Sequence, residues 1–147
     1  MPHINLGNDD FGIMSLFEYR PETARPLSEL AEMLLRGPSP LTRGERELIA
    51  SYVSSLNDCS FCTDSQRGGK QVSARDIEDA RQAGADDLQI HDTVLIAAAF
   101  CMYNRYVDGL ATTRPADRSD YAMAAEAIVN HGYLAGLPVP AQAPLPS

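Results

Sequence analysis

Helical spacing of apolar residues, interrupted by glycine and proline, runs through most of this 147-residue chain. The clearest stretch follows Thr42, where apolar side chains recur every three or four residues, the period of one helix face. These side chains are Leu48, Ile49, Tyr52, Val53 and Leu56. No segment alternates apolar and polar residues around a hairpin turn, as paired strands do. The pattern therefore predicts an all-α fold of about six helices.

Helix start and stop signals place these elements along the chain. Thr42 with Glu45 predicts a capping box. The other expected helices are 27–35, one from Asn57-Asp58 to Gly68-Gly69, one opened by Ser73 and Asp76 and closed by Gly84, one from Asp92 or Thr93 to about Leu110, and one after Ser119 ending near Gly132. We expect residues 1–26 to be irregular, because glycine and proline punctuate them, and the proline-rich tail 138–147 to be extended or disordered.

Length and charge restrict the class of protein. A chain of this length fits a single domain, 1–147. The net charge of −8 disfavours binding to nucleic acid or to an anionic membrane surface. The longest apolar run, Val94 to Tyr103, has ten residues, whereas a membrane span needs roughly 20. Residues 1–10 lack the apolar core of a secretory signal, so we expect a cytoplasmic protein.

Cys59 and Cys62 are the strongest local signal for chemistry. Residues three apart lie on one face of a helix, so the two sulfurs can approach each other. The first turn of a helix favours a thiolate, which attacks peroxides and disulfides, and a second thiol nearby can resolve the product. Two alternatives are an inert buried pair and half of a zinc site. Further zinc ligands would have to come from Cys101, His3, His91 and His131, which form no second close pair.

Glu47 is the next candidate, twelve residues before Cys59. If the chain turns at Asn57-Asp58, two successive helices bring this carboxylate beside the cysteine pair. A carboxylate near a thiol can move its proton, provided that burial raises the carboxylate's pKa. A solvated side chain is the alternative. The neighbouring Arg46 is expected to be a surface charge.

Three segments carry a resemblance to a known family. They are 45–50 (ERELIA), 54–62 (SSLNDCSFC) and 103–110 (YNRYVDGL). Together they resemble the AhpD-like, carboxymuconolactone decarboxylase-related superfamily, in particular its peroxidase-related, alkylhydroperoxidase-core branch. The resemblance covers roughly residues 41–110 and, more loosely, the whole chain.

The resemblance implies an all-helical domain with the cysteine pair at the start of a helix in a buried pocket. It implies an antioxidant enzyme that reduces peroxides and draws electrons from a dithiol partner such as a lipoylated protein. By position, Cys62 would attack, Cys59 would resolve and Glu47 would relay protons. Members assemble as dimers, trimers or hexamers with the cysteine helices near subunit contacts. We expect no metal and no other cofactor.

Gln66 departs from the family pattern, which has a histidine four residues after the second cysteine. Glutamine can donate and accept hydrogen bonds but cannot titrate. This loss favours an alternative function, that of a redox-responsive or structural oligomeric protein with weak or no peroxidase turnover. A decarboxylase or isomerase acting on a cyclic lactone is a third possibility. Decarboxylating relatives work without the cysteine pair, so the pair argues against it.

The remaining polar residues have structural interpretations. Cys101 lies in an apolar run and is expected to act as a small core residue. Asn104 and Arg105 are expected in a polar seam that fixes helix packing or a subunit contact, with a lining of the substrate pocket as the alternative. Asp64 and His91 are expected at the surface, and His131 near a helix C-terminus.

Overall fold

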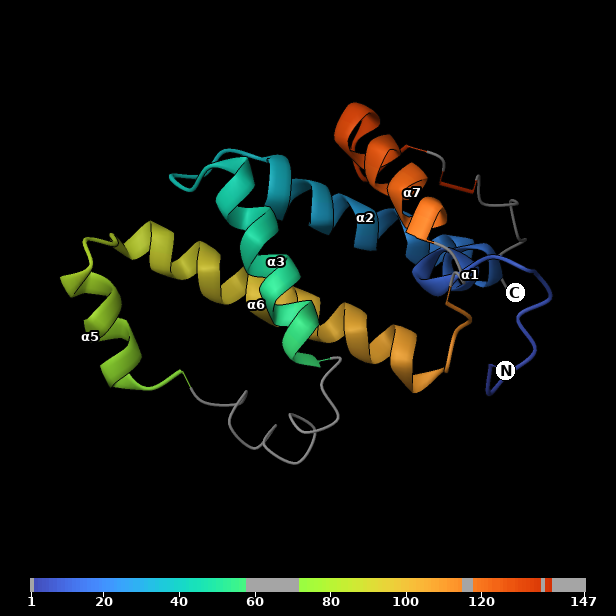
Figure 1. The fold of residues 1–147 in the computed structure, drawn as a ribbon, viewed down its shortest axis with the longest axis horizontal. Helices are drawn as coiled ribbons and strands as arrows, with labels where there is room; N and C mark the ends of the chain where they lie inside the picture. The colour runs from blue at the N-terminus through green and yellow to red at the C-terminus, as the bar shows by residue number, and fades with distance from the viewer. Residues whose placement is uncertain (1, 58–71, 115–117, 136, 139–147) are drawn as a thin grey trace, which may run out of the picture. The chain divides into compact units, whose positions relative to one another are not determined.

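The computed structural model describes residues 2–57, 72–114, 118–135 and 137–138. These residues form six α-helices and no strand (Figure 1), which confirms the predicted all-α class. The helices are α1 (Gly12–Tyr19), α2 (Pro21–Arg36), α3 (Arg43–Asn57), α5 (Ala74–Gln82), α6 (Asp87–Gly109) and α7 (Arg118–His131). The helix predicted to carry the cysteine pair lies outside the described residues. No helix in the described part of the chain has the length and apolar character needed to cross a membrane.

The chain divides into two compact units. One comprises Met1–Met33 and Arg105–Ser147, and the other comprises Leu34–Asn104. The division falls within α2 and within α6, so each of these helices contributes residues to both units. The predicted single domain over residues 1–147 stays a prediction.

The N-terminal region differs from the sequence prediction of irregular chain through residue 26. Helix α1 starts at Gly12 and α2 starts at Pro21. A proline is well placed at the first position of a helix, where its missing N–H has no partner to lose. Pro26 lies inside α2 despite the backbone hydrogen bond that proline cannot donate. Ala24, Ala31 and Leu35 of α2 are buried, and this burial offsets the lost hydrogen bond, which local sequence signals do not reveal.

The first unit is tied together by backbone contacts between distant parts of the chain. The His3 N–H donates to the Leu110 carbonyl at 3.0 Å. The Glu32 carboxylate accepts the N–H of Tyr133 at 2.8 Å, just beyond α7. Gly132, the residue before Tyr133, has a φ of +82°, and a Cβ added to it would lie 2.7 Å from a Glu32 carboxylate oxygen. The positive φ favours glycine here, and α7 ends near Gly132, as the sequence predicted.

In the second unit, two helices begin as predicted. The Thr42 N–H and hydroxyl donate to the Glu45 carboxylate at 2.7 and 2.8 Å, and the Glu45 N–H donates to the Thr42 hydroxyl at 3.3 Å. These bonds lower the pKa of Glu45. Ser73 and Asp76 form the same reciprocal capping box at the start of α5. Both boxes satisfy backbone N–H groups that a helix start otherwise leaves without partners.

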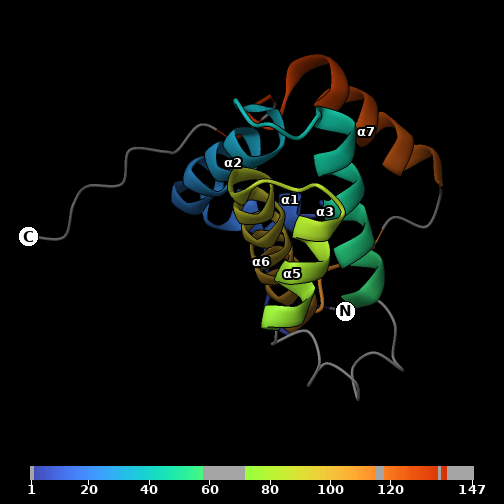
Figure 2. The same cartoon turned by 90° about the vertical axis from the view of Figure 1, so that its left-hand side faces the viewer.

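Helix α6 begins earlier than predicted, at Asp87 instead of Asp92 or Thr93. The Gln89 N–H donates to the Asp86 carboxylate at 2.7 Å, and the Asp86 N–H donates to the Gln89 side chain at 2.9 Å. The sequence contains this Asp86–Gln89 capping box, but the prediction placed the helix start at the apolar residues that follow it. The box adds a turn to the helix that runs beside α3 (Figures 1 and 2).

Candidate functional site

Of the four predicted site residues, the structure places Glu47. It lies on α3, which ends at Asn57, two residues before Cys59. Cys59, Cys62 and Gln66 lie outside the described residues, as does Asp64. Two expectations therefore stay predictions: that Glu47 lies close to the cysteine pair, and that the pair lies at a helix N-terminus.

The Glu47 side chain is exposed, whereas the sequence analysis made its role conditional on burial. Glu47 lies at the edge of the buried face of α3. Arg46 precedes it in the chain, Ala50 lies about one helical turn after it, and both are buried. Ser54 lies two helical turns further along the same edge. Its hydroxyl accepts a hydrogen bond from the Asn104 side chain at 3.2 Å.

This contact joins one residue from each of two sequence segments that carried the family resemblance, Ser54 and Asn104. Asn104 joins α6 to the edge of α3 on which Glu47 lies, as the expected polar packing seam requires. The adjacent Tyr103 is buried, packs edge-on against Phe100 with ring centroids 5.4 Å apart, and has its pKa raised by that burial. Arg105 does not pair with Asp108, whose carboxylate is held by Arg114 at 3.2 Å.

Arg46 corrects the sequence prediction of a surface charge, because its side chain is only 3% exposed. Its guanidinium donates to the carbonyls of Leu34 and Gly37 at 3.0 and 2.9 Å. These carbonyls belong to the C-terminal end of α2 and the turn after it, where helical partners are missing. Sequence spacing held a signal for this burial, since Arg46 shares a helix face with Ala50 and Val53.

A serine, an aspartate and a histidine meet where the turn after α2 touches α6. The Ser39 hydroxyl donates to one carboxylate oxygen of Asp92, and the other oxygen lies 3.1 Å from His91 Nδ1. The carboxylate stands between the hydroxyl and the imidazole. In a nucleophilic triad the imidazole takes the central place, where it can accept the hydroxyl proton. The contact therefore ties the turn to α6 and does not activate Ser39.

Asp92 should contribute pH-dependent stability through this contact. The Ser39 hydrogen bond lowers the pKa of Asp92 against the opposing effect of desolvation, with further help from the charges of His91 and Arg46. A carboxyl with a lowered folded pKa stabilises the protein above its unfolded pKa of about 3.9. That stability is lost as the pH falls through the folded value.

We expect Asp92→Asn to lower the free energy of unfolding by about 1 kcal/mol at neutral pH, because a charge-assisted hydrogen bond becomes a neutral one. The difference from the wild type should shrink as the pH falls below about 3.9. Urea unfolding of both proteins, from neutral pH to below about 3.9, measures this difference in the free energy of unfolding. Asp9→Asn in the N-terminal loop is the control. An equal loss of stability at all pH values would exclude a role for the charge.

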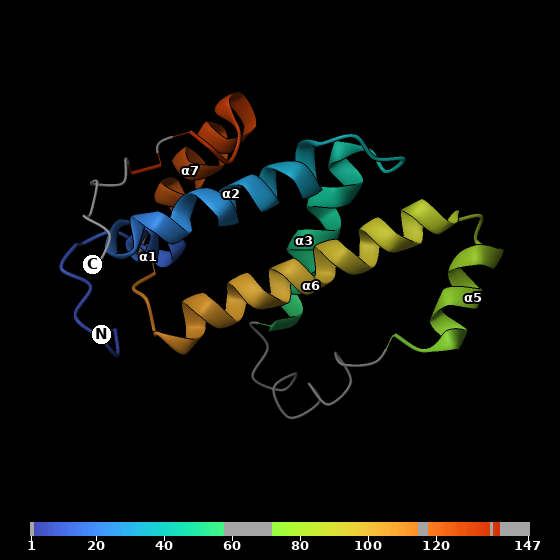
Figure 3. The ribbon, with the colours of Figure 1, turned by 180° about the vertical axis from the view of Figure 1, so that it is seen from behind.

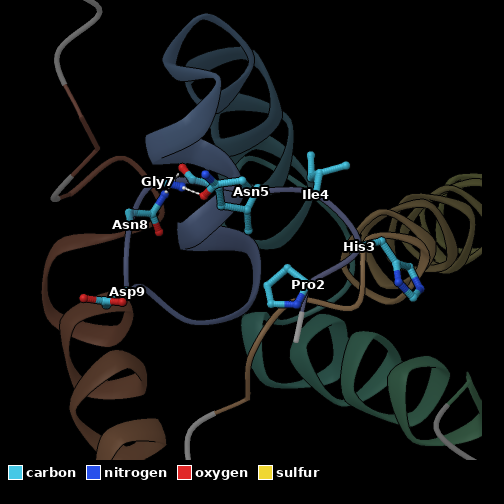
Figure 4. Close-up of a pocket in the computed structure, with 8 residues that line it drawn as sticks. Pro2, His3, Ile4, Asn5, Gly7, Asn8 and Asp9 are labelled. Carbon is cyan, nitrogen blue, oxygen red and sulfur yellow. Dashed lines mark hydrogen bonds between the residues drawn. The ribbon is translucent and has the colours of Figure 1, made fainter.

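The other candidate residues lie apart from these contacts. Cys101 is half-buried on α6, His91 is exposed, and His131 is exposed in the last turn of α7, as expected. His3 belongs to the N-terminal loop, where Pro2–Asp9 line an open pocket of about 490 Å³ (Figure 4). Glu47, the one predicted catalytic residue among those the structure describes, does not line that pocket. Among the described residues, no three or more histidine, cysteine or acidic side chains cluster as metal ligands.

Comparison with protein-family models identifies a match over residues 21–114 to the CMD, or carboxymuconolactone decarboxylase, family. The matched range covers more than half of the chain and includes Glu47, both cysteines of the pair and Gln66. Searches of curated proteins and of solved structures gave no match to this chain.

Proposed function

Because the chain belongs to the carboxymuconolactone decarboxylase family and carries a Cys-x-x-Cys pair within the matched range, we propose that it is a thiol-dependent peroxidase. In this proposal it is an AhpD-like antioxidant enzyme that works as a dithiol–disulfide oxidoreductase. The observation that carries the proposal is the pair itself, which follows directly on the helix that holds Glu47. The reducing cytosol is the compartment in which such a pair is kept as thiols between turnovers.

The proposed reaction has three steps. The Cys62 thiolate attacks one peroxide oxygen, the O–O bond breaks, and the alcohol leaves with a proton while Cys62 becomes a sulfenic acid. The Cys59 thiol then attacks the Cys62 sulfur, forming a disulfide and releasing water. An external dithiol reduces the disulfide by exchange and is itself oxidised. In sum, one peroxide and one dithiol give one alcohol, one water and one disulfide.

Glu47 is the proposed proton relay between the pair and the departing oxygens. The geometry supporting this role is its place on α3, ten residues before the helix ends at Asn57. The contact between Ser54 and Asn104 fixes the edge of α3 on which Glu47 lies. Gln66, in this proposal, orients water or a thiol by hydrogen bonding and moves no proton.

A redox-responsive protein with little turnover is the second candidate function. Two observations favour it: Gln66 replaces a residue that titrates near neutral pH, and the Glu47 side chain is exposed. Such a protein would form the Cys59–Cys62 disulfide once on oxidation and would not return quickly to the dithiol.

Steady-state reduction of an organic hydroperoxide distinguishes the two candidates. Purified protein is mixed with cumene hydroperoxide and dihydrolipoamide, and loss of each is followed. A peroxidase consumes one dithiol for each peroxide over many turnovers per enzyme. Consumption that stops after one equivalent of protein would support the redox-responsive candidate and overturn the peroxidase proposal.

Gln66→His should raise the peroxidase turnover. An imidazole at this position restores a group that can exchange protons near neutral pH, and general acid–base assistance is commonly worth about 10²–10⁴ in rate. We expect a gain of at least about tenfold in kcat, with a new ionisation near pH 6.5 in the pH–rate profile. Gln66→Asn is the matched control, since it keeps the amide but cannot titrate. Equal rates for both variants would show that proton transfer at this position does not limit turnover.

A further inference from the structure

The last turns of α3 are less well covered than its first turns. Arg46 and Ala50, on the buried face of the helix, are 3% and 2% exposed. Further along, Tyr52 and Leu56 are 63% and 43% exposed. Val53, which lies on the same face as Ala50, is only half-buried. Burial therefore supports the first half of α3 and gives little support to its end, and helix ends with few buried contacts open readily.

A hydrogen bond between side chains joins this poorly covered end of α3 to α6. The Asn104 amide nitrogen donates to the Ser54 hydroxyl oxygen at 3.2 Å, and Ser54 lies three residues before α3 ends at Asn57. Figures 1 and 3 view the crossing of the two helices from opposite sides, and in both the end of α3 reaches past α6. The two residues are 50 positions apart in the chain, so local helix formation does not supply this contact.

Helix α6 is well packed at the point from which this bond is made. Ile96, Ala99 and Tyr103 are buried on one side of the helix, and Tyr103 directly precedes Asn104. The Tyr103 ring packs edge-on against Phe100, which lies about one turn before Asn104. These contacts fix the backbone of α6 around Asn104. The hydrogen bond therefore anchors the end of a loosely covered helix to a firmly packed one.

The end of α3 is also where the chain continues toward the proposed reactive thiols. Cys59 follows Asn57 by two residues and Ser54 by five. We propose that Asn104 is a positioning residue for the thiol reaction: by holding Ser54, it fixes the end of α3 against α6, and with it the place from which the chain runs on to Cys59. Glu47, two helical turns before Ser54 on the same edge, is held by the same contact.

This inference rests on the proposed peroxidase function and adds a residue that acts on the reaction through α3. A polar contact that serves packing alone has a different consequence. Its removal lowers the free energy of unfolding but leaves the turnover of the folded protein unchanged. A positioning contact changes the rate of the chemical step in protein that is fully folded. The two roles are therefore separated by measuring kcat, KM and stability on the same variants.

Steady-state turnover of cumene hydroperoxide with dihydrolipoamide tests the role of Asn104. Asn104→Ala should lower kcat about tenfold, because a displacement of about 1 Å between reacting groups costs up to about a hundredfold in rate. KM should change by less than about twofold, since the bond acts on the reacting groups and not on substrate binding. Ser54→Ala should lower kcat equally, and the double variant no further, because both changes remove the same bond. Ser54→Thr keeps the hydroxyl and should turn over like the wild type.

Two further variants serve as controls. Ser51→Ala removes an exposed hydroxyl from α3 and should turn over like the wild type. Asp92→Asn breaks the contact of α6 with Ser39, so it lowers stability in the same unit but should leave kcat unchanged. Urea unfolding confirms that each variant is folded under assay conditions. Equal kcat for Asn104→Ala and the wild type, or losses that multiply in the double variant, would overturn this inference and leave the peroxidase proposal standing. A wild type without turnover would overturn both.

Discussion

Cys62→Ser is expected to lower the rate of peroxide turnover by about 10³-fold or more, because loss of a nucleophile removes most of an enzyme's rate enhancement. A serine hydroxyl is scarcely ionised near neutral pH and does not attack a peroxide oxygen, whereas a thiolate does. The measurement is the steady-state loss of cumene hydroperoxide with dihydrolipoamide in excess.

Two other cysteine variants serve as controls for this prediction. Cys101→Ser should turn over like the wild type, because Cys101 lies half-buried on α6 and has no proposed role in the reaction. Cys59→Ser should react once with peroxide to give a Cys62 sulfenic acid and then stall, because the resolving thiol is missing. Turnover by Cys62→Ser equal to that of the wild type would remove Cys62 as the attacking thiol.

Arg46→Met is expected to lower the free energy of unfolding by about 3 kcal/mol, because it leaves two carbonyls without their charged hydrogen-bond donor. Arg46 donates to the carbonyls of Leu34 and Gly37, which hold the end of α2 against the start of α3. Methionine fills a similar volume but leaves both carbonyls without their donor. Chemical unfolding in urea measures the change.

The neighbouring Arg43 supplies the control, because it is exposed in the first turn of α3. Arg43→Met should change the free energy of unfolding by less than about 0.5 kcal/mol, as surface substitutions generally do. Arg46→Lys should fall between the two, since lysine keeps the charge but lacks the planar fork that reaches two carbonyls. Equal effects of Arg43→Met and Arg46→Met would show that burial of Arg46 contributes nothing.

The helix starts that could be predicted from the sequence are those set by adjacent residues. The capping boxes of Thr42 with Glu45 and of Ser73 with Asp76 form within four residues of chain, so short-range chemistry decides them. The start of α6 was missed although Asp86 and Gln89 form a box of the same kind. The apolar run that begins at Val94 drew the predicted start too far along the chain.

The features that could not be predicted depend on contacts between distant residues. Prolines 21 and 26 indicate irregular chain by local preference, yet α2 begins at Pro21 and runs through Pro26, because burial of its apolar side offsets the one missing hydrogen bond. The partners of Arg46 are similar, since they are carbonyls nine and twelve residues earlier in the chain. Local signals carry no information on such partners.

For the candidate site, the sequence supplied residue types and spacing. It predicted the helix that carries Glu47 and the polar contact of Asn104 with a neighbouring helix. It left open whether the Glu47 side chain is buried or solvated, because exposure depends on which elements cover α3; in the structure the side chain is exposed. The proton-relay role of Glu47 accordingly stands as a proposal that the Glu47→Gln variant can test in the same peroxide assay.

The most direct measurement is the state of the cysteines after a single turnover. Fully reduced protein is treated with one equivalent of hydroperoxide, the remaining thiols are alkylated, and the peptides are identified by mass spectrometry. We predict a disulfide between Cys59 and Cys62, with Cys101 alkylated. Alkylation of Cys59 and Cys62 to the same extent as in untreated protein would contradict the account.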